Sequence, residues 1–324
     1  MRQGRAPYSR RALFRHDMPR LQDPHGKKID AGDRAMMTSL ECVPCLIRQT
    51  IDAAGLSSSD PVFHERALRD ILRRISGEDF SLTPPVIASM IHRRLRELSG
   101  VSDPYSPMKK SFNRLILSIT DLLEEKIEGS EQPLLAATRL AIAGNVIDFG
   151  AHSGITEPEV LASIEASYSM KLAGDHEYFL EKVSSAGSIL YIADNAGEIV
   201  FDRLLIERLG PSRVTLAVRG FPVINDATMD DAREAGLDRI VHVIENGSDI
   251  PGTQLSACSP EFRRHYDGAD MVIAKGQGNY ETLSDEEREI FFLLKVKCRI
   301  ISDHTGLPVG THAIIRSNNG GQEL

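Results

Sequence analysis

The sequence of 324 residues lacks any long apolar run. A membrane-spanning helix needs about 20 consecutive apolar residues, and no stretch approaches that length. The first residues also lack the apolar region of a secretory signal. Only four cysteines are present, and without a secretion signal they indicate free thiols in a reducing compartment. We therefore expect a soluble, cytoplasmic protein.

Positive charge is scarce in most of the chain. The net charge is −8, yet residues 1–36 carry nine Lys or Arg and only four Asp, which leaves 29 basic and 42 acidic residues elsewhere. Nucleic-acid binding depends on clustered Lys and Arg, so the acidic body disfavours it. A small phosphorylated metabolite remains a compatible partner, because a local site can be cationic. The sequence gives no indication of the oligomeric state.

Residues 1–38 are Arg-rich, contain Pro and Gly, and show no helical periodicity. We expect this segment to be a disordered or over-called extension, with Met36 or Met37 as the initiator. Its aspartates argue against a transit peptide.

The next part of the chain, over residues 39–185, has apolar residues at helical spacing. Helix starts are indicated at Asp60-Pro61, Thr83-Pro84 and Thr156-Glu157-Pro158. No strand pattern interrupts the stretch to about Leu180, so the spacing predicts an all-helical domain.

The pattern changes after residue 186, where short β-branched runs alternate with helical segments. The expected strands are 189–193, 214–218, 240–244, 271–274 and 290–294. Such alternation predicts an α/β domain over residues 186–324, with a mostly parallel sheet and helices on both faces. Ligands bind at the carboxyl ends of such strands, so the residues after each run are candidate site residues.

Polar residues follow four of these runs. They form the segments Asp194-Asn-Ala-Gly-Glu198, Arg219-Gly-Phe-Pro with Asn225-Asp226, Glu245-Asn-Gly-Ser-Asp249, and Lys275-Gly-Gln-Gly-Asn279. If the strands are parallel, these segments converge at one edge of the sheet.

The chemistry of this set is that of a metal and phosphate site. Asp194, Asn195 and Asp226 offer oxygen ligands, which hard divalent cations prefer. Three protein ligands leave positions for water and substrate. Lys275 and Arg219 could hold a phosphate, helped by backbone N–H groups at helix N-termini.

Each residue also has a simpler interpretation. Asp194, Asn195 or Asp226 alone could be helix N-caps, and the glycines could be ordinary turns. Lys275-Gly-Gln-Gly is not a Walker A loop, because the terminal Gly-Lys-Ser/Thr is missing. Their repeated placement after successive strands favours a functional site.

Together these segments resemble the damage-control phosphatase family, long catalogued as a domain of unknown function. The resemblance extends from Ser39 to about Gly310 and is closest to the prokaryotic branch with a Cys-x-x-Cys motif. The residues that carry it are Asp194–202, Arg219–226, Lys275–281, Glu41-Cys-Val-Pro-Cys45, Asp103-Pro-Tyr105, Gly144-Asn-Val-Ile-Asp148 and Lys297-Cys298.

The resemblance implies a Rossmann-like α/β domain beside a helical domain, with the active site between them. It implies a metal held by Asp194, Asn195 and Asp226, with manganese, cobalt or nickel often preferred to magnesium. Members hydrolyse phosphate monoesters, including sugar phosphates and damaged phosphometabolites. One eukaryotic branch has been proposed to methylate carboxyl groups.

These observations give each remaining residue an expected role. Lys275 would stabilise the charge on the phosphate, or it would be a buried structural lysine paired with Glu281. Asp194 or Glu198 would act as the base. We expect Arg219 and Asn225 to bind substrate. Asn145 and Asp148 could close the site from the helical domain, or serve only as caps and interdomain hydrogen-bonding groups.

Three other functions compete with this one. A haloacid-dehalogenase phosphatase would need Asp-x-Asp after the first strand, and a methyltransferase would need Gly-x-Gly-x-x-Gly there; neither occurs. A non-enzymatic, metal-dependent binder of phosphorylated ligands is the main alternative.

The thiols leave two alternatives open. Cys42, Cys45 and Cys298 could share a zinc ion with a fourth ligand, either a histidine or Cys258. They could equally pack as small buried residues, and we favour packing.

Overall fold

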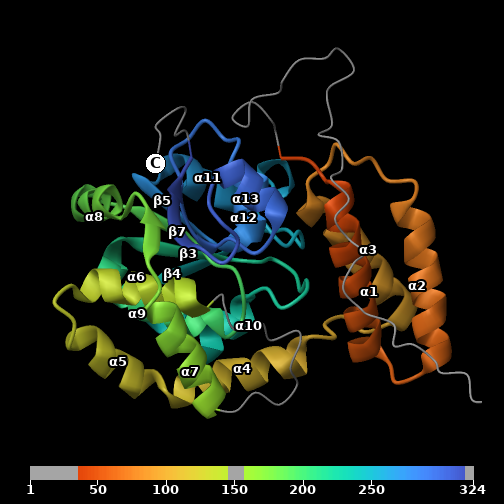
Figure 1. Cartoon of the computed structure of the whole chain (residues 1–324), viewed down its shortest axis with the longest axis horizontal. Helices are drawn as coiled ribbons and strands as arrows, with labels where there is room; N and C mark the ends of the chain where they lie inside the picture. The colour runs from red at the N-terminus through yellow and green to blue at the C-terminus, as the bar shows by residue number, and fades with distance from the viewer. Residues whose placement is uncertain (1–35, 145–156, 318–324) are drawn as a thin grey trace, which may run out of the picture. The chain divides into compact units, whose positions relative to one another are not determined.

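The computed structural model describes residues 36–144 and 157–317, and residues 35–324 belong to one compact unit (Figure 1). Within the described ranges the helices are α1 Val43–Ser57, α2 Pro61–Ile75, α3 Pro84–Ser99, α4 Ser106–Ser118, α5 Thr120–Glu128, α6 Pro133–Gly144, α7 Glu157–Tyr168, α8 His176–Ser185, α9 Glu198–Leu209, α10 Met229–Glu234, α11 Pro260–Gly268, α12 Gly276–Leu283 and α13 Arg299–Thr305. The strands are β1 Leu172–Gly174, β2 Ile189–Ile192, β3 Val214–Val218, β4 His242–Glu245, β5 Met271–Lys275, β6 Phe291–Lys295 and β7 His312–Arg316.

The seven strands form one sheet in the order β1-β7-β6-β5-β2-β3-β4. Every neighbouring pair is parallel except β6 and β7, which are antiparallel. The prediction of a mostly parallel sheet is therefore confirmed. Because β2 lies between β3 and β5, the carboxyl ends of these three strands are adjacent at one edge.

The five expected strands correspond to β2 through β6, and their bounds agree to within one residue except at the start of β4. Strand β4 begins at His242 rather than at residue 240, because a 3-10 helix over Leu237–Arg239 precedes it. Strands β1 and β7 were not predicted. β1 lies within the stretch expected to be entirely helical, and that expectation is wrong at this point. A strand of three residues is too short to show a period-2 pattern.

Alternate side chains of the strands face two different hydrophobic cores, as the pleat requires. Tyr191, Leu216 and Ile273 belong to the core shared with helices α4 to α10. Leu190 and Ala217, their neighbours along the strands, belong to the core shared with α11 to α13. Helices therefore cover both faces of the sheet, as expected (Figure 1).

The helical N-terminal region is also confirmed, but it does not have a single core. Helices α1 to α3 pack around their own cluster, which includes Ile71, Ile87 and Leu95. Helices α4 to α7 instead share the core of the sheet through residues such as Ile116 and Leu140. The division at residue 186 stays a prediction.

The local sequence explains where the helices begin. Asp60 caps α2 by accepting a hydrogen bond from Val62 N at 2.9 Å, and Pro61 occupies the first helical position. Pro84 likewise occupies the first position of α3, but the Thr83 side chain makes no capping hydrogen bond there. The predicted start at Thr156 lies outside the described residues. Every helix within those residues is too short or too polar to span a lipid bilayer.

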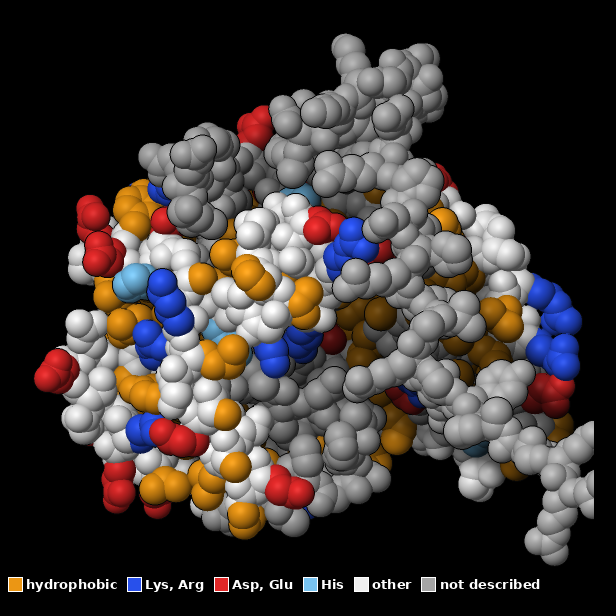
Figure 2. Space-filling model, viewed as in Figure 1, with side chains coloured by type: hydrophobic (Ala, Val, Ile, Leu, Met, Phe, Trp, Pro, Cys, Tyr) orange, Lys and Arg blue, Asp and Glu red, His pale blue; other side chains and the backbone are white. Residues whose placement is uncertain are grey.

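Figure 2 shows that acidic and basic side chains are interspersed on the visible face of the described residues. Ion pairs also join elements that are distant in sequence. Arg93 Nε and Arg96 Nη2 of α3 bind Asp249 Oδ2 at 2.8 and 2.6 Å. Burial raises the pKa of Asp249, but the two guanidinium groups outweigh it and the net pKa is lowered. Arg96 Nη1 also donates to Pro222 O at 2.9 Å. Helix α3 is thus fixed to two loops at the carboxyl edge of the sheet.

His92 is buried in the same interface, with its ring centroid 6.0 Å from that of Tyr105. Burial, reinforced by the nearby charge of Arg96, lowers its pKa to about 4 from an ordinary value of 6.5. The native state therefore disfavours the protonated ring.

We predict that the free energy of unfolding falls as pH is lowered from about 6.5 to about 4, because the unfolded chain takes up a proton that native His92 resists. In the variant His92→Leu the free energy of unfolding should fall less steeply with pH, because the unfolded chain takes up as much as one proton fewer. Urea unfolding at several pH values measures it. An equally steep dependence in the variant would show that other groups are responsible.

Candidate functional site

Two loops at the carboxyl edge bring the expected metal ligands together. The loop after β2 carries Asp194 and Asn195, and the loop after β3 carries Asp226. Ala227 N donates to Asp194 O at 2.8 Å, and Asn195 and Asp226 form an isolated β-bridge. These backbone contacts place the two carboxylates and the amide side by side at the end of the sheet.

Asp194 lies against the first turn of α12. Gly276 has a φ of 77°, and a Cβ at that position would lie 1.8 Å from Asp194 Oδ2. Only glycine can therefore stand there, because it lacks a Cβ and tolerates positive φ. Asn195 Nδ2 donates to Asp194 Oδ2 at 2.8 Å and to Glu198 Oε2 at 3.0 Å. A single amide thus joins the two carboxylates expected to act as base.

Arg219 is 1% exposed, and each of its three side-chain nitrogens donates to a protein group. Its Nε donates to Asp226 Oδ2 at 2.6 Å. Its Nη1 donates to Thr253 Oγ1 at 3.2 Å, and its Nη2 donates to Asn279 Oδ1 at 3.1 Å. Nη2 also lies 4.0 Å from Asp194 Oδ1. Arg219 therefore positions Asp226 and supplies positive charge beside Asp194.

Lys275 is completely buried between β5 and α9. Its Nζ donates to Glu198 Oε1 at 2.7 Å, to Asp202 Oδ1 at 2.5 Å and to Ala141 O at 2.9 Å. An ammonium group has three donors, so all three have partners. Glu281, a possible partner in the sequence, instead accepts from the Gln277 side chain.

Burial of this many charges changes their proton affinities. Four carboxylates (Asp194, Glu198, Asp202 and Asp226) face two cations (Arg219 and Lys275), all of them buried. Burial, followed by repulsion from Glu198 and Asp226, raises the pKa of Asp194 to about 8. Burial also raises the pKa of Asp226, against the opposing effect of Arg219. The site as built therefore carries excess acidic groups that a cation would neutralise.

The same network shifts the pKa values around Lys275. Burial raises the pKa of Asp202 to about 6, although Lys275 opposes the shift. Burial lowers the pKa of Lys275, but Asp202 and Glu198 outweigh it and raise the net pKa. Tyr191 Oη donates to Asp202 Oδ1 at 2.7 Å. Lys275 is thus held in its charged form.

Of the other residues expected to bind substrate, the structure describes Asn225 but not Asn145 or Asp148. Asn225 lies in the loop before Asp226, and its backbone carbonyl accepts from Ala196 N at 2.9 Å. Asn145 and Asp148 lie outside the described residues, so their expected role stays a prediction.

The sequence interpretation missed two buried polar residues of α4. Lys109 Nζ lies 2.8 Å from Asp231 Oδ2, and its charge acts to lower the pKa of Asp226. Asn113 Oδ1 accepts from Gly197 N at 2.6 Å, just before α9. Both residues fall on the helix face that Phe112 and Ile116 bury. The sequence did contain a signal for them, because two polar residues occupy positions on the apolar face of this helix.

Lys297 was also missed as a site residue, although it belongs to the resemblance. Its side chain is exposed, and its positive charge acts to lower the pKa of Asp194. Unlike Lys275 and Arg219, it offers a cation at the surface of the site.

Three of the four thiols lie close together. Burial raises the pKa of Cys42, and the thiols of Cys298 and Cys45 are near enough to raise it further. Cys258 is buried in a different environment, near Arg219 and Arg263. Cys45 is exposed, whereas Cys298 is half-buried and packs against the core under α11 to α13. Whether these thiols only pack or bind an ion stays a prediction.

A cavity of about 480 Å³ lies away from these residues, at the amino ends of β2 and β3. Its lining includes Ser188, Arg213 and Arg239. None of the expected metal ligands lines it, so cavity size does not locate the chemistry in this protein.

Comparison with known proteins identifies the family. Residues 38–312 match the model of the damage-control phosphatase ARMT1-like domain. The chain belongs to the damage-control phosphatase family. The resemblance seen in the sequence is thereby confirmed.

Relatives from archaea match most of the chain. A damage-control phosphatase of Pyrococcus horikoshii is 33% identical over 288 residues, which cover 87% of this chain and 99% of the relative. A damage-control phosphatase of Archaeoglobus fulgidus is 34% identical over 282 residues, covering 85% and 97%. An uncharacterised protein of Methanocaldococcus jannaschii is 36% identical over 292 residues, covering 85% and 94%.

A solved structure supports the same family fold. The crystal structure of a DUF89 family protein from Pyrococcus horikoshii matches with a TM-score of 0.81 and 32% identity, over 87% of this chain and all of that chain. The α/β sheet and the helical N-terminal region are therefore family features.

The Lys275 network generates a stability prediction for this damage-control phosphatase family member. Lys275→Ala should lower the free energy of unfolding by about 3–5 kcal/mol, because it leaves Glu198 and Asp202 buried without their cation. Urea unfolding measures the loss.

The double variant Lys275→Ala, Asp202→Asn should recover part of that stability, because it removes one of the stranded charges. Lys110→Ala, at an exposed lysine of α4, is the matched control and should change stability by less than about 0.5 kcal/mol. Equal losses in the single and double variants would contradict the ion-pair explanation.

Proposed function

We propose that this protein is a divalent-metal-dependent phosphatase that hydrolyses small phosphate monoesters. The observation that carries the proposal is the cluster of buried Asp194 and Asp226 with half-buried Asn195 at the carboxyl edge of the sheet, with excess acidic groups around it. The names of the archaeal relatives support the phosphatase activity. Sugar phosphates and damaged phosphometabolites are the proposed substrate class.

The residues at the site fit a divalent cation. Asp194 and Asp226 offer carboxylate oxygens and Asn195 offers an amide oxygen, a donor set that suits Mg²⁺ or Mn²⁺ and also accepts Co²⁺ or Ni²⁺. Two positive charges would offset the two unbalanced carboxylates of the buried cluster. When bound, such an ion polarises a phosphate oxygen and acidifies water.

Glu198 and Asp194 are the proposed proton acceptors, and they act as a pair. Asn195 Nδ2 bridges Asp194 Oδ2 and Glu198 Oε2. One amide therefore holds both carboxylates in place, and either of them can accept the proton of the attacking water. Lys275 Nζ fixes the other oxygen of Glu198 at 2.7 Å. Lys275 therefore acts through Glu198 as a positioning residue.

Lys275 and Arg219 already donate to protein groups, so we expect an exposed cation to bind the phosphate. Lys297 is exposed and acts on Asp194, so it is the proposed contact for the phosphate oxygens. Backbone N–H groups at the start of α12, next to Asp194, add further donors. Lys109 supports the site from α4 by its charge near Asp226.

The metal ligands are tested by isosteric substitution. Asp194→Asn, and separately Asp226→Asn, should reduce manganese-dependent phosphate release from a phosphosugar panel by at least about 100-fold. Both variants should stay folded, because each removes a buried charge. Asn195→Ala should cost less, since it removes a neutral ligand.

Asp230→Asn on α10 is the matched control, because Asp230 is exposed and pairs only at the surface with Arg233. It should retain full activity. Wild-type rates in both Asp194→Asn and Asp226→Asn would refute the assignment. Binding of phosphosugars without release of phosphate would favour the non-enzymatic binder.

Lys297 provides a separate test of phosphate binding. Lys297→Ala should raise KM about tenfold, the size expected for loss of one charge-assisted hydrogen bond, with little change in thermal stability. Lys110→Ala is the control for loss of an exposed lysine. An unchanged KM with a reduced melting temperature would assign Lys297 a structural role.

A further inference from the structure

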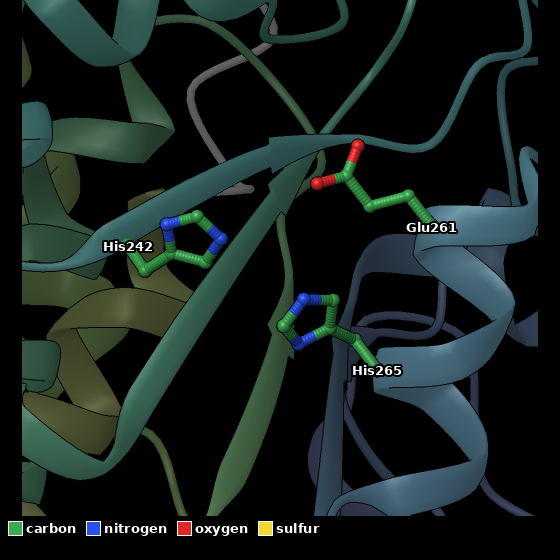
Figure 3. A group of neighbouring side chains, drawn as sticks. All are labelled: His242, Glu261 and His265. Atoms are coloured by element: carbon green, nitrogen blue, oxygen red, sulfur yellow. The ribbon is translucent and has the colours of Figure 1, made fainter.

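A second cluster of ligand-type side chains lies on the edge strand of the sheet, away from the proposed phosphatase site. His242, Glu261 and His265 each offer one ligand atom, and these atoms all lie within 4.8 Å of one another. Within the described residues this is the only group of three His, Cys, Asp or Glu side chains that meets this distance. Figure 3 shows the three side chains converging from β4 and α11.

The fold explains why these three side chains meet. His242 is the first residue of β4 and lies on the same face as Ile244, which packs in the core below α11. Helix α11 rests on that core through Phe262. Glu261 and His265 are four residues apart, so they lie one above the other on the same side of the helix. Because β4 is the last strand of the sheet, no further strand covers His242.

The cluster has the donor set of a transition-metal site. Two imidazoles and one carboxylate suit Zn²⁺, and also Ni²⁺ or Cu²⁺, whereas Mg²⁺ and Ca²⁺ prefer oxygen ligands alone. Tetrahedral zinc with bonds of about 2.0–2.2 Å holds its ligand atoms about 3.4 Å apart. The two histidine rings, with centroids 5.5 Å apart, need only small side-chain rotations to reach that spacing. His242 and Glu261 are exposed and His265 is half-buried, so an ion has access from solvent.

We propose that His242, Glu261 and His265 form a binding site for one divalent transition-metal ion of the zinc class. The site is separate from Asp194, Asn195 and Asp226 and differs from them in ligand chemistry. The bound ion would join the edge strand β4 to α11 and leave coordination positions open to water.

The proposed ion would bind both ends of the segment between β4 and α11, and this segment reaches the proposed phosphatase site. Between β4 and α11, Asn246 Oδ1 accepts from Gly220 N at 3.0 Å, and Asn246 O accepts from Ser259 N at 2.8 Å. Thr253, in the same segment, accepts from Arg219. The ion would therefore hold together the two ends of the segment that supports Arg219.

The test is metal binding by the full-length protein in an Asp226→Asn background, which weakens the phosphatase site. Metal-free protein is equilibrated with low free zinc in excess magnesium, and bound zinc is measured by elemental analysis. We expect one zinc per chain. His242→Ala and His265→Ala should each weaken zinc binding by at least about tenfold. Zinc should also raise the melting temperature of the parent protein but not of these variants, because an ion that binds the native state stabilises it.

Two controls separate this site from other ligands. His64→Ala, on α2, removes a histidine outside the cluster and should keep the zinc. The variant Cys42→Ser, Cys45→Ser should keep it as well, and the cobalt-substituted protein should lack a thiolate charge-transfer band. Parent protein without tight zinc, zinc retained by both histidine variants, or a thiolate band that disappears with the cysteines would each overturn the proposal. None of these measurements depends on phosphatase activity.

Discussion

Lys275 is the point at which the sheet, two helices and the candidate site meet. It extends from β5 and binds Glu198 and Asp202 of α9, as well as the carbonyl of Ala141 in α6. A buried ammonium group is tolerated only with such compensation. The same contacts fix Glu198, which accepts a hydrogen bond from Asn195, so the orientation of Asn195 depends in part on Lys275. Packing and chemistry are therefore coupled at Lys275.

Burying these acidic groups together is unfavourable, and the proposed metal ion would offset that cost. Asp194 and Asp226 are buried close to Glu198. Burial is the main cause that raises the pKa values of both aspartates, and repulsion from Glu198 adds to it. A protein without a ligand for this cluster would gain stability by replacing one aspartate with a neutral residue. Strain and unfavourable charge of this kind concentrate at functional sites. Ile224, two residues before Asp226, has a positive φ of 44°, which adds backbone strain in the same loop.

Ligand chemistry distinguishes the two proposed metal sites. The cluster around Asp194 offers oxygen atoms within a buried, acidic environment, whereas His242 and His265 offer nitrogen atoms at the surface. Hard and borderline cations would therefore distribute between them according to donor type. One chain can then use one ion for chemistry and another for holding β4 to α11.

The sequence alone determined the order of elements, the mostly parallel sheet and the residues at its carboxyl edge. It could do so because each of these follows from local patterns: helical spacing, β-branched runs and polar residues at strand ends. The family resemblance rested on the same segments, such as Asp194–198 and Lys275–281. Strand β1 escaped because it has only three residues and pairs with β7, a strand distant in sequence. Strand β7 was missed although it also pairs with β6, the preceding strand of the chain.

The tertiary structure decided which partners each side chain has. The sequence suggested phosphate or Glu281 as the partner of Lys275, and the fold gave it Glu198 and Asp202. It also brought Lys109 from α4 towards Asp226, and His242 from β4 towards His265 of α11. The physical reason is that the type of ligand or charge is local information, whereas its electrostatic partners are set by how helices and strands pack across the sheet. The spacing of residues along the chain does not give the distances between side chains in the folded protein.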